Sequence, residues 1–598
     1  DKIEKNVVIG KLEADSMKTI SNVNLSGLGS NSGLIKEVKT SFKNITFENC
    51  NIKGNGGYSG IISISRGTTS NCKFNNINIE ISGDFVGPIS RNIAGSLNNI
   101  TLKNITINAR SYVGGLVGQS TSTGSSANIE GTYLKITGTG NYVGGIFGYV
   151  DGAIENIYAY QYSANGKQSS DTETTWLAKG NQFVGGAVGQ YGGGGNTLTT
   201  VKTTNSKVMG TNFVAGNVGY GSGNVNLGTS ENNIITGTGN YIGGNVGYHG
   251  WSCNNSNSKN NTISGNNYIG GNSGGLGWAS EYNVTSENNK ITGNEYVGGC
   301  TGIGDNYYSY INNAKSRGNN QQIKGTNHVG GVIGRIVGRA KSVQAENCTI
   351  TATGSYVGGT IGSSEYSTNS ISGTNSEYYS VAGANAKNVT VKASMNYVGG
   401  IVGYQVGTLY GAVLENSNIT ANGSNVGGIA GFYTGYNGTA ASYVSSANFF
   451  LWHSYVTDST IKGSTQVGGI TGKFVYGNIQ YCYVANSSVI SEQNAVGGIV
   501  GYFDNSKLSN IQYKATIKYN FIANTDDSAV IIGNDSVGGV VGMLAKNLNY
   551  DEDIEKYNNI ECNLIVADIS SNGSYIDMGA GSVSGTAVGL IQSKYMNN

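Results

Sequence analysis

Closely spaced carboxylates are the residues of this chain that could do acid and base chemistry. Asp526 and Asp527 are adjacent, and Asp551, Glu552 and Asp553 form a second group toward the end of the sequence. Carboxylates that converge on one face can cleave a glycan, because one donates a proton while another activates water or attacks the sugar. Both groups fall in an insertion or near the end of the chain, where a solvated loop explains them better than an active site.

Motifs for metal and cofactor chemistry are missing from the sequence. There is no HExxH zinc motif, no Walker loop and no calcium-binding nonapeptide with its Asp. The three histidines, His249, His328 and His453, are far apart, and no CxxC pair occurs. We therefore expect no catalytic residue, no metal, no cofactor and no enzymatic activity.

Aromatic side chains in and beside the longer loops are the other candidates for function. Loops on a rigid scaffold concentrate binding residues, and exposed Tyr and Trp are common interface anchors. The candidate binding residues are Trp176, Trp251, Trp278, Tyr307, Tyr308, Tyr433, Tyr436, Phe449, Phe450 and Trp452. The alternative is that these loops fold back and cover the sheet.

A repeated motif, an aromatic residue followed by Val-Gly-Gly-x-x-Gly, positions all of these residues. It stands in full at residues 112–118 and returns as far as residues 536–542. The first motif glycine, replaced once by Ala215, is Gly114, Gly144, Gly185, Gly243, Gly270, Gly298, Gly330, Gly358, Gly399, Gly427, Gly468, Gly497 and Gly538. The shortest step between copies is 27 residues, and four steps of 41 residues mark insertions. A period of this size predicts a solenoid, and insertions at one phase predict loops on one face.

Between the motifs, β-branched residues alternate with polar ones, as in residues 100–108, which is typical of strands. Asn, Gly and Ser separate these short runs and favour turns. Three short strands and three turns fit one unit. The sequence predicts an all-β, single-chain parallel β-helix of about 17 or 18 rungs of about 27 residues with four longer insertions. We expect an N-terminal cap at 1–30, repeats at 31–545, and a degenerate rung and C-terminal cap at 546–598.

Two sets of side chains are expected to stack along the axis of the β-helix, and the cysteines are expected to be buried singly. Rings precede the motif Val from Tyr58 to Tyr397, with His328 as the exception, and would stack in register. If this column instead faces solvent, it becomes a binding stripe. Asn217, Asn245 and Asn272 are expected to form an amide ladder. The seven scattered cysteines share no phase in adjacent rungs, which predicts small buried thiols and no disulfide ladder.

The motif copies, and units such as residues 477–483 followed by residues 496–501, resemble the GLUG-motif repeat family over roughly residues 30–545. The resemblance implies a large secreted or surface protein of bacteria. Adhesin-like proteins and the non-catalytic repeat region of some IgA-cleaving metallopeptidases carry such repeats. The repeat is a scaffold, so it does not by itself indicate an activity.

Composition agrees with an extracellular structural role. Lys and Arg number 36 against 35 Asp and Glu, with no basic stripe for nucleic acid. No apolar run is long enough to cross a bilayer, so we expect no transmembrane segment. The expected function is a bacterial surface or extracellular element: a self-assembling filament subunit, or an adhesin stalk that binds a host or glycan ligand. The alternatives are the scaffold region of a secreted enzyme and a β-helix enzyme that acts on glycans.

Overall fold

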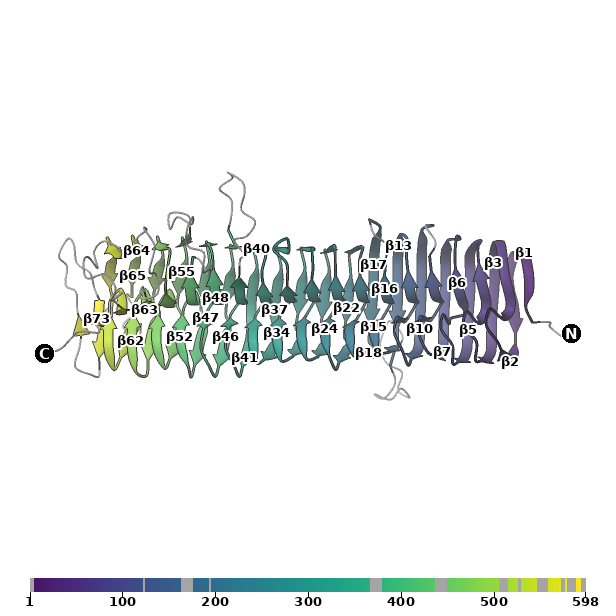
Figure 1. Ribbon diagram of the computed structural model, residues 1–598, viewed down its shortest axis with the longest axis horizontal. Helices are drawn as coiled ribbons and strands as arrows, with labels where there is room; N and C mark the ends of the chain where they lie inside the picture. The colour runs from purple at the N-terminus through teal and green to yellow at the C-terminus, as the bar shows by residue number, and fades with distance from the viewer. Residues whose placement is uncertain are drawn as a thin grey trace. The chain divides into compact units, whose positions relative to one another are not determined.

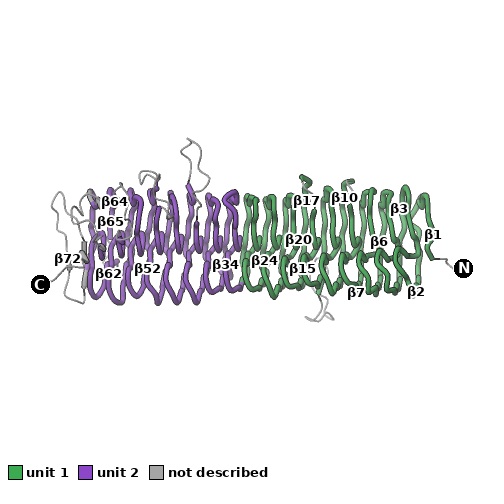
Figure 2. The backbone as a smooth tube through the Cα atoms, in the orientation of Figure 1, with its two compact units in different colours: residues 1–291 green, residues 292–598 purple. Residues whose placement is uncertain are grey.

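The computed structural model describes most of the chain. The described residues are 5–121, 124–162, 176–192, 195–365, 379–435, 449–504, 515–524, 529–545, 558–571, 576–577 and 588–592. The chain divides into two compact units, unit 1 (residues 1–291) and unit 2 (residues 292–598), which are described separately (Figure 2). The sequence did not predict this division.

Unit 1 consists of coils of short strands that pair in parallel with the next coil (Figure 1). One coil contains β19 (Asn212–Ala215), β20 (Val218–Gly221), β21 (Asn224–Asn226), β22 (Thr229–Glu231) and β23 (Ile234–Gly237). These strands pair in order with β24 (Asn240–Gly243), β25 (Val246–His249), β26 (Ser252–Asn254), β27 (Asn257–Lys259) and β28 (Thr262–Ser264). This coil has five short strands, so the expectation of three does not hold for it. An earlier coil of unit 1 does have three strands, β8 (Val113–Gly114), β9 (Val117–Ser120) and the longer β10 (Ser126–Gly138).

Unit 2 repeats this arrangement. One coil contains β47 (Val398–Gly399), β48 (Val402–Val406), β49 (Leu409–Tyr410), β50 (Val413–Glu415) and β51 (Asn418–Ala421). The next coil contains β52 (Ser424–Gly427), β53 (Ala430–Thr434), β54 (Phe450–Trp452), β55 (Tyr455–Thr457) and β56 (Thr460–Gly463). The predicted all-β parallel solenoid is confirmed, with about 16 turns in the chain. No described residue belongs to a helix that could span a bilayer.

The chain bends at single residues in the left-handed region. Within β7 (Leu97–Ala109), Asn99 and Asn104 have φ of 55° and 56°, and Tyr112 before the motif has φ of 53°. Asn adopts this conformation more readily than most residues, because its short side chain can hydrogen-bond locally. One such residue therefore turns the chain without ending the strand.

The core is made of columns of inward side chains in equal register. Ile105 lies between Ile77 and Leu134 of the neighbouring coils, and Ile100 lies between Cys72 and Ile129. All six are at most 1 % exposed. Each coil thus buries its apolar residues against its two neighbours, as expected for a solenoid.

The motif glycines stand where backbones of successive coils meet. Gly144 pairs in register with Gly114 and Gly185, so the glycines fall in a column as predicted. A Cβ on Gly148, the last motif glycine, would overlap the Gly118 carbonyl oxygen and the backbone of Tyr112. At the first position the chain accommodates buried Ala215, whereas the last position is Gly in every copy from Gly118 to Gly542.

The regions expected as caps also contain coil strands. In unit 1, β1 (Val7–Ser21) and β2 (Asn24–Leu28) pair in parallel with β3 (Gly33–Gly54), so residues before 31 form a coil. In unit 2, β69 (Asn558–Glu561) and β70 (Leu564–Val566) continue the pairing of β64 (Ala515–Lys518) and β65 (Phe521–Ala523). Coil strands therefore also occur before residue 31, and those after residue 546 fall in the region expected to hold a degenerate last rung.

The insertions do not share one position in the coil. In unit 2, residues 366–378, 436–448 and 505–514, which lie outside the described residues, each follow the strand after the motif: β43 (Ile361–Glu365), β53 and β63 (Val500–Asp504). In unit 1 the added residues 163–175, also outside the described residues, follow β13 (Ile154–Tyr160), one strand further along the coil. The expectation of a single phase holds only within unit 2.

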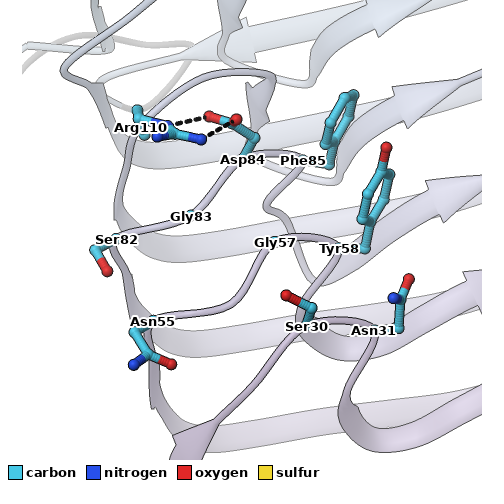
Figure 3. Close-up of a pocket in the computed structure, with 10 residues that line it drawn as sticks. All are labelled: Ser30, Asn31, Asn55, Gly57, Tyr58, Ser82, Gly83, Asp84, Phe85 and Arg110. Carbon is cyan, nitrogen blue, oxygen red and sulfur yellow. Dashed lines mark hydrogen bonds and ion pairs between the residues drawn. The ribbon is translucent and has the colours of Figure 1, made fainter.

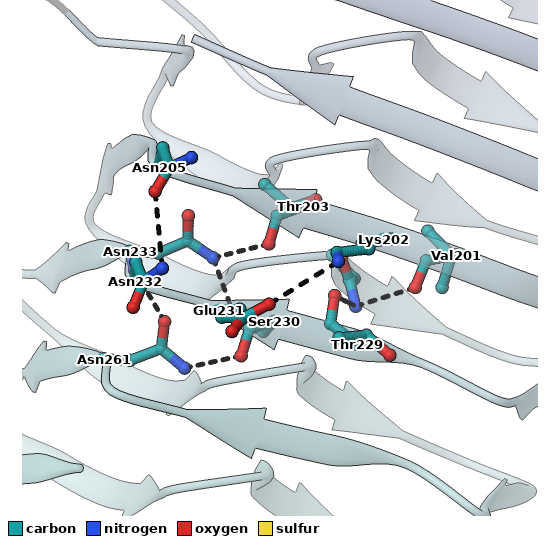
Figure 4. Close-up of polar contacts among 11 residues, drawn as sticks. Val201, Lys202, Thr203, Asn205, Thr229, Ser230, Glu231, Asn232, Asn233 and Asn261 are labelled. Atoms are coloured by element: carbon teal, nitrogen blue, oxygen red, sulfur yellow. Dashed lines mark hydrogen bonds and ion pairs between the residues drawn. The ribbon is translucent and has the colours of Figure 1, made fainter. Parts of the chain in front are cut away.

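Two amide ladders stabilise the interior of unit 1. Asn217 Nδ2 donates to Asn245 Oδ1 at 2.6 Å, and Asn245 donates in turn to Asn272; all three are fully buried, as predicted. A second ladder was not predicted: Asn261 Oδ1 accepts from Asn233 N at 2.7 Å, and Asn233 Nδ2 donates to Thr203 O at 2.9 Å (Figure 4). These amides satisfy backbone groups at a buried corner, which would otherwise destabilise the fold.

Replacing Gly148 by Ala should lower the free energy of unfolding by about 3 kcal/mol, because the new methyl group overlaps backbone atoms that cannot move independently. The matched control is Gly250→Ala, where a Cβ meets no atom within 4 Å. Urea denaturation followed by circular dichroism compares the two variants. Equal midpoints for the variants would contradict the close approach of the coils.

Candidate functional site

In each unit the rings before the motif Val form a stacked column, and these rings are here called the motif ladder. In unit 1 its members are Tyr58, Phe85, Tyr112, Tyr142, Phe183, Phe213, Tyr241 and Tyr268, and in unit 2 they are Tyr296, His328, Tyr356 and Tyr397. Successive ring centroids lie 4.3 to 5.1 Å apart in unit 1 and 4.5 to 5.2 Å apart in unit 2. The predicted stacking is confirmed.

The motif ladder belongs to the scaffold and is not an open binding stripe. Its rings are half-buried, and a second column covers them edge-on: Tyr248 lies 5.1 Å from Tyr241, and Tyr404 lies 5.6 Å from Tyr356. Each ladder residue has a left-handed backbone, for example φ of 63° at Tyr241, which costs about 1–2 kcal/mol. Ring stacking contributes about 0.5–1.5 kcal/mol per pair and offsets much of that cost.

Three of the predicted binding residues are exposed, and Tyr307 and Trp176 are half-buried. Trp251 and Trp278, on adjacent coils of unit 1, are 54 % and 69 % exposed. In unit 2, Tyr308 is 53 % exposed and its ring centroid lies 3.8 Å from that of Tyr307. Trp176 is half-buried: its Nε1 donates to Thr137 Oγ1 at 3.0 Å, and its ring lies under Lys179 Nζ at 4.5 Å.

Two predicted binding residues belong to the core, so the expectation of surface contacts was wrong for them. Tyr433 is fully buried and its ring stacks on Phe474 at 5.7 Å, because the residue faces inward on β53. Phe449 is 8 % exposed and covers the Gly435 backbone. Tyr436 lies outside the described residues.

The remaining two, Phe450 and Trp452, belong to a larger aromatic surface of unit 2, here called the corner patch. Its members are Tyr410, Phe450, Trp452, His453, Tyr455, Tyr481, Tyr483, Tyr519 and Phe521. They lie on β49, β54, β55, β60 (Tyr483–Ala485) and β65, or at the corners between these strands.

The corner patch has two rows of rings along the coils. In the first row, His453, Tyr481 and Tyr519 occupy left-handed corners, and neighbouring rings stack at 5.3 Å. In the second row, Tyr455, Tyr483 and Phe521 are paired in register, and the last two stack at 5.3 Å. The rows are held by the strand pairing itself, so their side chains are rigidly placed.

The rings of this patch are more open than those of the motif ladder. Tyr455, Tyr481 and Tyr519 are 41 %, 45 % and 44 % exposed, and Tyr410 is 38 % exposed. Leu564, 60 % exposed, pairs with Phe521 and continues the second row by one coil. Val566, 49 % exposed, pairs with Ala523 in the column beside that row. Contiguous apolar surface of this kind commonly marks an interaction site.

The same registers carry mostly polar residues earlier in unit 2, with Val413 as the exception. Tyr455 follows Val413, Asn385, Gln344 and Lys315 in its column. The adjacent outward column changes from Arg317, Glu346, Lys387 and Glu415 to Thr457, Ala485 and Ala523. The coil thus accommodates polar or apolar side chains at these positions, so the fold does not require the aromatic ones.

Sequence reasoning missed Tyr410, His453, Tyr481 and Tyr519 as one surface. The row formed by His453, Tyr481 and Tyr519 lies 15, 16 and 19 residues before the next motif glycine, which is Gly468, Gly497 and Gly538 in turn, and Tyr410 belongs to the neighbouring column, where it pairs with Trp452. Because the separation from the motif glycine changes from coil to coil, these residues do not recur at a fixed interval in the sequence. The adjacent pairs Trp452-His453 and Tyr481-Cys482-Tyr483 were the only local hint.

A shallow hollow of about 510 Å³ lies at a corner of unit 1, next to the start of the motif ladder (Figure 3). Its one carboxylate, Asp84, accepts from Arg110 Nε at 2.7 Å and from Ser111 N at 3.1 Å. Tyr58 and Phe85 form its aromatic edge. With the acid held by an arginine, the hollow does not resemble a carboxylate pair for glycan cleavage.

The carboxylate groups singled out as possible catalysts, Asp526-Asp527 and residues 551–553, lie outside the described residues. Within the described residues no three His, Cys, Asp or Glu side chains are grouped to hold a metal ion. Residues 271–275 fit a GxSxG pattern, but Ser273 is fully buried on β30 (Ser273–Leu276).

Comparison of the chain with protein-family models, with characterised proteins and with solved structures found no match in any of the three. The resemblance to GLUG-motif repeats therefore stays a prediction.

The cysteines are thiols, and six are buried as expected, whereas Cys562 is exposed. Burial raises the pKa of Cys50 to about 11 and that of Cys348 to about 12, which suppresses the reactive thiolate. A thiol reagent should therefore label one of the seven cysteines in the native protein and all seven in denaturant. Cys562→Ser should abolish the native labelling, and fast labelling of further thiols would show that the coils open.

His328 makes the stability of unit 2 depend on pH. Burial between Tyr296 and Tyr356 lowers its pKa from 6.5 to about 4, and its Nδ1 lies 2.7 Å from Ser363 Oγ. Folding favours the neutral imidazole. Its contribution to the free energy of unfolding is complete above pH 6.5 and decreases by roughly 2 kcal/mol as the pH falls toward 4. His328→Tyr, which matches its ladder neighbours, should remove this part of the pH dependence of thermal unfolding. Identical pH profiles of variant and parent would refute the assignment.

Proposed function

We propose that the protein is a non-catalytic scaffold of a bacterial surface or secreted protein that makes its contacts through the corner patch of unit 2. The observation that carries this proposal is the row of partly exposed rings from Tyr410 to Phe521 at registers where other coils carry polar residues. Exposed aromatic surface lowers solubility, so a function is the simplest reason for its presence on an otherwise polar repeat.

The rigidity of the patch supports a binding role. Its rings are fixed by parallel strand pairing and by stacking at 5.3 Å, so little conformational entropy is lost on contact. Tyr and Trp also combine a large apolar area with a polar group, which is why they dominate binding hot spots. The resemblance to repeats of adhesin-like proteins, and the near-neutral charge of the chain, agree with this interpretation.

The test compares binding of the full chain and of a double variant, Tyr455→Gln with Tyr483→Asn, to defined probes. The probes are an array of host and bacterial glycans, purified extracellular-matrix proteins and the chain itself. The replacements copy Gln344 and Asn385 from the same column, so the coil should fold unchanged. We expect the double variant to lose at least about tenfold in affinity for whichever probe binds the parent chain.

The matched control replaces the exposed tryptophans of unit 1, Trp251→Gln with Trp278→Gln, and should leave binding unchanged. If the patch variant binds every probe as the parent does, the corner patch is not the contact surface. If only the control variant loses binding, the contact lies on unit 1.

A further inference from the structure

We propose that the occupant of the corner patch is the corner patch of a second copy of this chain. This inference rests on the proposed function, because it concerns the same surface, and it commits that surface to a homotypic contact between two chains. Its support comes from the area, the chemistry and the spacing of the exposed rings.

The area is close to what a specific dimer needs. Four tyrosines, Tyr410, Tyr455, Tyr481 and Tyr519, are 38 % to 45 % exposed, and an aromatic side chain has about 150–250 Å² of surface. They alone present roughly 250–420 Å². The half-buried rings and the exposed Leu564 and Val566 bring the patch toward the about 800 Å² per partner of a standard interface.

The chemistry favours protein over carbohydrate. A sugar ring stacks on an open aromatic face, but stacking at 5.3 Å covers both faces of Tyr481 and one face each of His453 and Tyr519. In addition, Lys518 Nζ lies 5.2 Å from the Tyr519 ring centroid, and the Trp452 ring lies 5.1 Å from that of His453. What remains open is ring edges and hydroxyl groups, beside the aliphatic Leu564 and Val566. Aromatic residues surrounded by charged residues such as Lys387 and Glu415, which pair at 2.7 Å, match the core and rim of a protein interface.

The spacing selects a second copy among proteins. The rings repeat once per coil, so only a partner with the same repeat can make an equivalent contact at every coil. A second copy of the chain has the same coil spacing because it has the same sequence. A two-fold arrangement lets each patch serve as donor and acceptor of the same contacts. The small residues Thr457, Ala485 and Ala523 run beside the second row, so this column carries no long side chain that would keep a partner away from the rings.

The experiment is sedimentation velocity of the full chain from nanomolar to high micromolar concentration. We expect a monomer–dimer equilibrium for the parent chain. The double variant Tyr455→Gln with Tyr483→Asn should dissociate at least about thirtyfold more readily, as for the loss of one hot spot. The unit 1 control, Trp251→Gln with Trp278→Gln, should associate like the parent.

A second variant protects the test against a folding defect. Tyr481→Asn with Tyr519→Asn places Asn at two left-handed corners, where Asn is common in this chain, so the backbone is preserved. It should also weaken the dimer, with an unchanged circular dichroism spectrum. A parent chain that stays monomeric at every concentration, or patch variants that associate like the parent, would overturn the inference.

The two proposals fail separately. A monomeric parent whose glycan or matrix-protein binding is lost in the patch variants overturns the homotypic contact and leaves the proposed function standing. A monomeric parent whose patch variants bind every probe as the parent does overturns both.

Discussion

The equal register of successive parallel strands is the constraint on which the rest of the structure depends. Because each residue pairs with the residue at the same position of the next coil, as Val143 does with Val113 and Val184, side chains of one kind fall into columns. Stacked strands lie about 4.8 Å apart, a distance that suits ring stacking, amide hydrogen bonds and aliphatic contact alike. The core, the amide ladders, the motif ladder and the corner patch are all columns of this kind.

The corners determine which columns can exist. A coil that bends at a single left-handed residue needs Asn, or another residue whose conformational cost is offset by its neighbours. At the corner before the motif Val, that offset comes from stacked rings. After Tyr397 this corner carries no ring, yet its backbone keeps the left-handed conformation, with φ of 61° at Asn425 and 60° at Ala495. The side chain is therefore partly independent of the bend that it occupies, which lets His453, Tyr481 and Tyr519 stand at another corner of unit 2.

The motif spacing was enough to predict the fold, because a solenoid depends on near neighbours in sequence and space. The glycine column, the Asn217 ladder and the stacking of Tyr58 to Tyr397 all followed from a constant phase. The five-stranded coil and the burial of Tyr433 and Phe449 did not, because short strands separated by single bent residues leave no clear break in sequence. The corner patch, apart from Phe450 and Trp452, escaped prediction for a related reason. Insertions and one-residue shifts move its members relative to the motif, and only the strand pairing brings them together. The second amide ladder had a visible signal, the repeated Asn-Asn of residues 232–233, 260–261 and 288–289.

The column arrangement also determines how the surface of unit 2 can change over evolutionary time. Each ring of the corner patch contacts only its own coil and the adjacent ones, so a duplicated coil lengthens both rows by one ring and leaves the other registers as they were. A deleted coil shortens them in the same way. The contact surface can thus be lengthened in whole steps by gene duplication, with binding strength set by the number of coils and the chemistry of each coil left intact.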